Sequence, residues 1–114
     1  MDAQQIFNTA LMATLDQGEP ALNYLGQCVY RANNGNKCAV GHLIDDATAQ
    51  RFGLRAMSRI DPTELPDDLQ DHHDLLTAIQ RAHDDAQQHP DLFRKDFRDR
   101  MAIVAHTFNL EMPE

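Results

Sequence analysis

The sequence has no tryptophan, only two cysteines and no long run of apolar residues. Without an uninterrupted stretch of about 20 apolar residues it offers no candidate membrane span, so we expect no membrane partner. The first five residues lack the basic and apolar segments of a secretory signal, and two cysteines are too few for a disulfide framework. We therefore expect a cytoplasmic protein with reduced thiols.

Basic residues are scarce as well. Ten lysines and arginines stand against 18 aspartates and glutamates, which gives a net charge of -8. A surface of this sign repels the phosphate backbone, so direct nucleic-acid binding is not expected. Such a charge is typical of a protein whose acidic residues only keep it soluble. It is also typical of a protein that docks on a basic surface of a partner protein.

The 114 residues fit a single domain, which we place at residues 1–114. Asp2 and Gln5 predict a capped helix start, and Gly18 with Pro20 predicts its end. Asp91 is predicted to cap the last helix. Each of these two helices carries an apolar stripe at helical spacing. The stripes are Ile6, Phe7, Ala10, Leu11 and Leu15 in the first helix, and Phe93, Phe97, Met101, Val104, Ala105 and Phe108 in the last.

The middle of the chain combines a turn signal with further helical patterns. Asn34-Gly35 lies between β-prone residues, which predicts a short β-hairpin over about residues 28–38. A buried helix is expected at 39–44, a capped short helix from Asp45 or Asp46 to Gly53, a loop at 54–66, and a longer helix from about Leu69. The predicted fold class is therefore mainly α, a compact bundle of four or five helices with one short β-hairpin.

Cys28, Cys38 and His42 are the first candidate metal ligands, because thiolates and an imidazole are zinc donors. The hairpin register decides whether they can meet. A two-residue turn at Asn34-Gly35 places the two thiols on opposite faces, whereas a three-residue loop places them on one face. The other interpretation is two small buried thiols and a helix histidine. We expect no cofactor, and keep a zinc-supported domain as an alternative.

A second cluster combines histidines with aspartates in the third quarter of the chain. His83 shares a predicted helix face with Leu76 and Ile79, and the adjacent His83-Asp84 pair occurs in metal-dependent hydrolases. A hydrogen-bonded core histidine is the other interpretation of His83. The acids on and around this helix are expected to form a solvated face and a tentative partner-binding surface: Asp67, Asp68, Asp71, Asp74, Asp84 and Asp85.

Tyr30, Arg31 and Lys37 form the one compact basic and aromatic group in this acidic chain. Such a group is able to hold an anionic ligand, so the three residues are tentative binding residues. The alternative is that Arg31 and Lys37 only solvate the hairpin.

The segment Cys28-Val29-Tyr30-Arg31, followed by Gly35-Asn36-Lys37-Cys38-Ala39-Val40-Gly41-His42-Leu43-Ile44-Asp45, resembles small uncharacterised proteins of phages, prophages and bacterial genomes. They share a C-x-Y-R…G-x-K-C-A-x-G-x-L-I-x-D block. The likeness extends more loosely to residues 79–84 and 105–110, and it implies a phage-linked context without an assigned activity. We expect a non-enzymatic accessory or inhibitor protein that binds a host protein. The sequence leaves the oligomeric state open.

Overall fold

The computed structural model describes residues 1–113 and is mainly helical, which confirms the predicted class. Its α-helices are α1 (Ala3–Gln17), α2 (Asp46–Phe52), α3 (His73–Asp85) and α4 (Pro90–Thr107). Short 3-10 helices connect them: η1 (Val40–Leu43), η2 (Met57–Arg59), η3 (Pro62–Glu64) and η4 (Asp67–His72). Among the described residues, no helix combines the length and the apolar character needed to cross a membrane.

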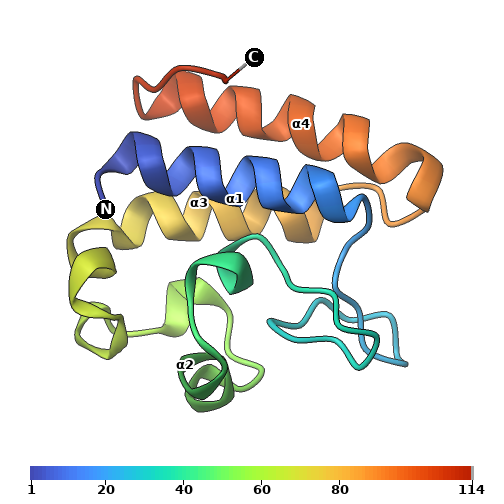
Figure 1. Ribbon diagram of the computed structural model, residues 1–114, viewed down its shortest axis with the longest axis horizontal. Helices are drawn as coiled ribbons and strands as arrows, with labels where there is room; N and C mark the ends of the chain where they lie inside the picture. The colour runs from blue at the N-terminus through green and yellow to red at the C-terminus, as the bar shows by residue number, and fades with distance from the viewer. Residues whose placement is uncertain (114) are drawn as a thin grey trace.

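The long helices α1, α3 and α4 run side by side, and α2 with the connecting turns packs beneath them (Figure 1). The Asp2 carboxylate accepts a hydrogen bond from the Gln5 backbone amide, and the Gln5 side-chain oxygen accepts one from the Asp2 backbone amide. Gly18 ends α1 with a φ of 81°. The predicted boundaries of this helix are therefore confirmed. The predicted stripes face one another in the core; the fully buried members are Ile6, Phe7, Ala10, Leu11, Phe93, Phe97 and Met101.

Two helix starts differ from the prediction. α4 is capped by His89, whose ring nitrogen accepts from the Asp91 amide, and Pro90 occupies the first helical position. Asp91 is thus a first-turn residue rather than the cap, because proline has no amide hydrogen and is favoured at that position. α3 begins at His73, since the residues before it form the tighter helix η4.

The predicted β-hairpin over residues 28–38 is wrong, because no part of residues 1–113 forms a regular strand. Pairing in this segment is limited to one antiparallel bridge, Arg31 with Lys37. Cys28 pairs instead with Leu22, across the preceding turn. The ladder does not lengthen because the chain turns into η1 directly after Cys38, where Ala39 already has helical backbone angles.

Two equivalent turns take the place of the hairpin. Asn23 and Ala32 each donate a backbone hydrogen bond to the residue four positions later, and Gly26 and Gly35 close the turns with φ values of 77° and 92°. Each turn therefore has a three-residue loop that ends in a glycine with left-handed backbone angles. Residues with a side chain rarely adopt these angles. The second loop, Asn33-Asn34-Gly35, is one of the two predicted registers. The two turns are spaced nine residues apart, a repeat that was not predicted from the sequence.

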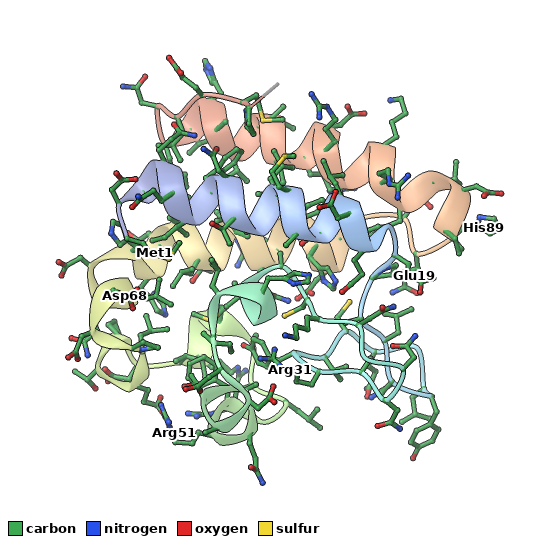
Figure 2. The ribbon with its side chains drawn as sticks, viewed as in Figure 1. Met1, Glu19, Arg31, Arg51, Asp68 and His89 are labelled. Carbon is green, nitrogen blue, oxygen red and sulfur yellow. The ribbon has the colours of Figure 1, made fainter. Side chains whose placement is uncertain are left out.

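Arg31 joins these turns to the helical part of the protein (Figure 2). Its guanidinium donates to the carbonyl oxygens of Gly41 at 2.8 Å, Ile44 at 2.7 Å and Tyr30 at 3.2 Å, and to the Asp46 carboxylate at 2.8 Å. These bonds satisfy backbone carbonyls in a segment that has almost no β-ladder. Arg31 thus acts here as an internal brace of the fold.

Candidate functional site

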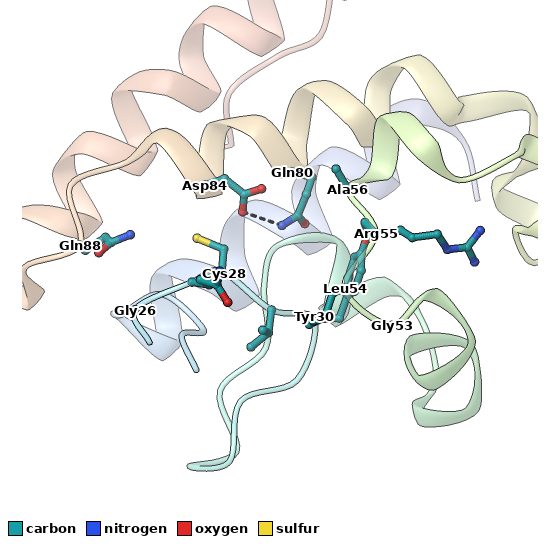
Figure 3. A pocket seen from close by; sticks show the side chains of 12 residues that line it. Gly26, Cys28, Tyr30, Gly53, Leu54, Arg55, Ala56, Gln80, Asp84 and Gln88 are labelled. Atoms are coloured by element: carbon teal, nitrogen blue, oxygen red, sulfur yellow. Dashed lines mark hydrogen bonds between the residues drawn. The ribbon is translucent and has the colours of Figure 1, made fainter. Parts of the chain in front are cut away.

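A pocket of about 380 Å³ opens between the first turn and the segment after α2 (Figure 3). Gly26, Gln27 and Cys28 line one side of it, and the stretch from Gly53 to Ala56 lines the other. The C-terminal half of α3 contributes Gln80 and Asp84. The pocket therefore brings together the first turn, the segment after α2 and the end of α3, and the first and last of these lie about 55 residues apart in the chain.

Asp84 is the charged group at the centre of this arrangement. Its Oδ1 accepts from the Gln80 side-chain amide at 2.8 Å and from His83 Nδ1 at 2.9 Å. The Cys28 thiol points toward the same carboxylate from the first turn (Figure 3). The Asp84 side chain keeps 36% of its surface exposed, whereas that of His83 is completely buried. Asp84 is therefore the member of the His83-Asp84 pair that reaches the pocket.

His83 is held in one tautomer by its two neighbours. The Ala21 amide donates to Nε2 at 3.3 Å, which makes Nε2 an acceptor and leaves the ring proton on Nδ1 for Asp84. The ring also meets Phe93 edge to face, with centroids 5.7 Å apart. Both ring nitrogens thus form hydrogen bonds within the fold, as the interpretation of His83 as a hydrogen-bonded core histidine predicts.

Gln80 extends this network into the core. It is buried on the inner face of α3, and its Oε1 accepts from the Val40 amide at 3.2 Å while its Nε2 donates to Asp84. Gln80 is not among the site residues predicted from the sequence. The available signal was a polar residue on the same helical face as Leu76, Ile79 and His83.

Both thiols are held in the neutral form. Burial, followed by the negative charge of Asp84 and a hydrogen bond to it, raises the pKa of Cys28 from an ordinary value of 9.0 to about 12. Burial also raises the pKa of Cys38 to about 12, partly opposed by the Gly41 amide, which donates to its Sγ. A thiol in this state is a poor nucleophile, because the thiolate is the reactive form. The site therefore has no activated cysteine.

This pKa predicts slow alkylation of Cys28 in the folded protein. A pKa higher by three units lowers the thiolate fraction at pH 8 about a thousandfold, and the greater nucleophilicity of a more basic thiolate restores only part of it. We expect iodoacetamide to label Cys28 on the order of 30-fold more slowly than in urea-unfolded protein. Because the pKa is raised, the folded-state rate should keep rising above pH 9. Mass spectrometry of labelled peptides measures both rates.

Asp84→Asn is the matching variant, because it removes the charge while retaining an acceptor oxygen for Gln80 and His83. It should accelerate labelling of Cys28 and leave the fully buried Cys38 unreactive. Equal labelling rates for Cys28 in the folded and unfolded wild-type chains would contradict the account of its environment.

The candidate metal ligands predicted from sequence do not assemble as a set. Among residues 1–113, the one group of three or more such donors that comes within 4.8 Å consists of Cys28, His83 and Asp84. Cys38 lies in the core against Gly41, and the buried Nε2 of His42 has no hydrogen-bond partner within residues 1–113. Burial, together with the charges of Lys37 and Arg31, lowers the pKa of His42.

The remaining predicted binding residues fall in different places. Tyr30 is buried and donates to the Arg55 carbonyl at 2.7 Å, Arg31 forms the internal brace, and Lys37 pairs with Arg31 through the backbone. The six acids divide into two groups. Asp67, Asp68, Asp71 and Asp74 are exposed on η4 and the first turn of α3, whereas Asp84 and Asp85 lie at the other end of α3.

Comparisons with known protein families, with characterised proteins and with solved structures gave no match to this chain.

Proposed function

We propose that the protein is a non-enzymatic accessory or inhibitor protein that acts by binding a partner protein, in the phage-linked context that its sequence resemblance implies. The partner places a basic side chain in the pocket beside Asp84. One observation carries this proposal: Asp84 is a partly buried carboxylate with no lysine or arginine within ion-pair distance in residues 1–113.

The donors around Asp84 are an amide, an imidazole and a neutral thiol, so none of them balances its charge. The two nitrogen donors, Gln80 and His83, both bond to Oδ1, and within residues 1–113 the thiol of Cys28 is the other donor to this carboxylate. Arg55 is the basic residue on the pocket wall, but its guanidinium points away (Figure 3) and pairs with Glu64 at 2.9 Å. A cation supplied by a partner would balance the charge of Asp84, and removing one member of a desolvated charge pair at an interface weakens binding.

Apolar side chains around the pocket supply the rest of a docking surface. Leu54 lines the pocket and is 81% exposed. Tyr24 and Leu25 are 90% and 65% exposed at the tip of the turn whose Gly26 and Gln27 line the opposite side. Aromatic residues are enriched in protein-binding sites, and contacts that surround a central anchor exclude water from it.

The hydrolase alternative has less support from this geometry. Both ring nitrogens of His83 bond within the protein, and its side chain is fully buried. Cys28 is neutral, and Asp84 lies between it and His83 as a shared acceptor. A reacting group in the pocket would therefore meet a carboxylate and a protonated thiol, without an available base of the imidazole type.

Photo-crosslinking tests the proposed face. A photoreactive phenylalanine analogue replaces Leu54 in the full chain, expressed in the host bacterium, and a second chain carries it at Ile103, which is exposed on α4. We expect one partner to be captured from position 54 and not from position 103. The purified partner should then bind Asp84→Asn at least tenfold more weakly than wild type, because the charged contact is lost.

Asp74→Asn is the matched control, since it removes the same charge from the same helix about 15 Å away along its axis. It should change affinity by less than twofold. If Asp74→Asn weakens binding while Asp84→Asn does not, the pocket is not the docking site and the acids at the start of α3 take its place.

A further inference from the structure

Cys28, His83 and Asp84 place three different donor atoms close together. One thiol sulfur, one imidazole nitrogen and one carboxylate oxygen lie within 4.8 Å of one another. Cys28 comes from the end of the first turn, and the other two come from the last turn of α3. The group is therefore built by the tertiary fold, and its members are neither one acidic cluster nor a single cysteine.

These donor types suit zinc and similar borderline cations. Thiolate sulfur binds Zn²⁺ at about 2.3 Å, and imidazole nitrogen and carboxylate oxygen bind it at about 2.0–2.2 Å. Donors of a tetrahedral site consequently lie about 3.3–3.7 Å apart. Side chains whose donor atoms already lie within 4.8 Å reach that spacing by small rotations, and Cys28 and Asp84 are only partly buried.

The pocket provides access and a fourth position. Cys28 and Asp84 both line it, so a cation held between them would face the open space of about 380 Å³. Neither residue forms an ion pair with a lysine or arginine in the described part of the chain. The net charge of -8 also favours the approach of a cation.

Binding would change the hydrogen bonds of His83 in a defined way. The nitrogen facing the cluster is Nδ1, which now carries the ring proton and donates to Asp84. Coordination through Nδ1 moves that proton to Nε2, where the Ala21 amide can no longer donate. The bond that is lost is the longer of the two, at 3.3 Å against 2.9 Å. The Ala21 amide is therefore a built-in reporter of coordination.

We propose that Cys28, His83 and Asp84 bind one zinc-like divalent cation, with a fourth position open to the pocket. The Cys28 thiol releases its proton to solvent when its sulfur binds the cation, and the His83 proton moves to Nε2. This ligand set differs from the set predicted from sequence, in which Cys38 and His42 accompany Cys28, and it replaces the expectation of no cofactor. A cation here would compete with the basic side chain of a partner for Asp84, but the test below involves no partner.

Cobalt titration of chelator-treated, reduced protein tests the proposal, because a thiolate bound to Co²⁺ gives a near-ultraviolet charge-transfer band. We expect one equivalent of Co²⁺ to produce this band and Zn²⁺ to displace it. Cys28→Ser should abolish the band and Asp84→Asn should weaken affinity at least tenfold. Cys38→Ala, which removes the other thiol, should retain the band.

Amide and imidazole NMR spectra of the wild-type protein provide a second readout that does not depend on the folding of any variant. Zn²⁺ should shift the Ala21 amide and the His83 ring, and should leave the His42 ring in place. The proposal is overturned if no charge-transfer band forms, if the band survives in Cys28→Ser, or if Zn²⁺ shifts His42 and Cys38 while Ala21 and His83 stay unchanged.

Discussion

Replacing Phe97 with alanine is expected to lower the free energy of unfolding by about 3–5 kcal/mol. Phe97 is fully buried on α4, and its ring stacks on Phe93 with centroids 5.6 Å apart and planes 11° from parallel. Truncation removes the ring from the centre of the three long helices and leaves a cavity there. Because domains are typically stable by about 5–15 kcal/mol, much of the total is lost. Urea unfolding followed by circular dichroism measures the change.

Ile103→Ala is the control for this prediction. Ile103 lies on the same helix and is 67% exposed, so its truncation should change stability by less than about 0.5 kcal/mol. Similar unfolding midpoints for Phe97→Ala and the wild-type chain would contradict the packing of α4 against α1 and α3.

Arg31→Met is expected to destabilise the protein by on the order of 3 kcal/mol. Methionine keeps the apolar stem but removes every donor, so the carbonyls of Gly41 and Ile44 lose their charged partner. Both of these residues are buried, and an unsatisfied buried carbonyl carries a desolvation penalty. The stability of Arg31→Lys should be closer to that of Arg31→Met than to that of wild type. One ammonium group cannot reproduce the forked set of donors of the guanidinium.

The matched control is Arg59→Met, since Arg59 is exposed and its side chain makes no hydrogen bond within residues 1–113. Its melting temperature should stay near the wild-type value. Equal melting temperatures for the Arg31 and Arg59 variants would show that Arg31 does not brace the turns.

The helices that sequence predicted well are those whose signals are local. Asp2, Gln5 and Gly18 define α1 through bonds between residues three or four positions apart. All members of the predicted apolar stripe except Phe108, which follows its last residue, likewise lie within α4. The hairpin failed for the opposite reason: Tyr30 and Arg31 bond to Arg55 and to the segment after Cys38. No local sequence pattern predicts contacts between residues this far apart. These contacts take the place of the expected β-ladder.

The candidate site shows the same division. His83 was recognised as an inward-facing histidine from helical spacing, and its neighbour Asp84 was among the predicted acids. The position of Cys28 beside them depends on the path of the two turns, which lie far from α3 in the sequence. Leu54 and Leu25 could not be assigned to the pocket rim, because single exposed leucines are common in proteins and their sequence neighbourhood says nothing about a shared face.

Mapping a basic probe by NMR tests the central claim, that the pocket beside Asp84 receives a cationic group. The probe is an acetylated, amidated peptide with one arginine between two leucines, and the control peptide has glutamate in place of arginine. We predict that the arginine peptide shifts amide signals from Gly26 to Tyr30, from Gly53 to Ala56 and from Gln80 to Gln88, that Asp84→Asn removes these shifts, and that the glutamate peptide causes none. Shifts confined to residues 67–74, or shifts that persist in Asp84→Asn, would contradict the claim.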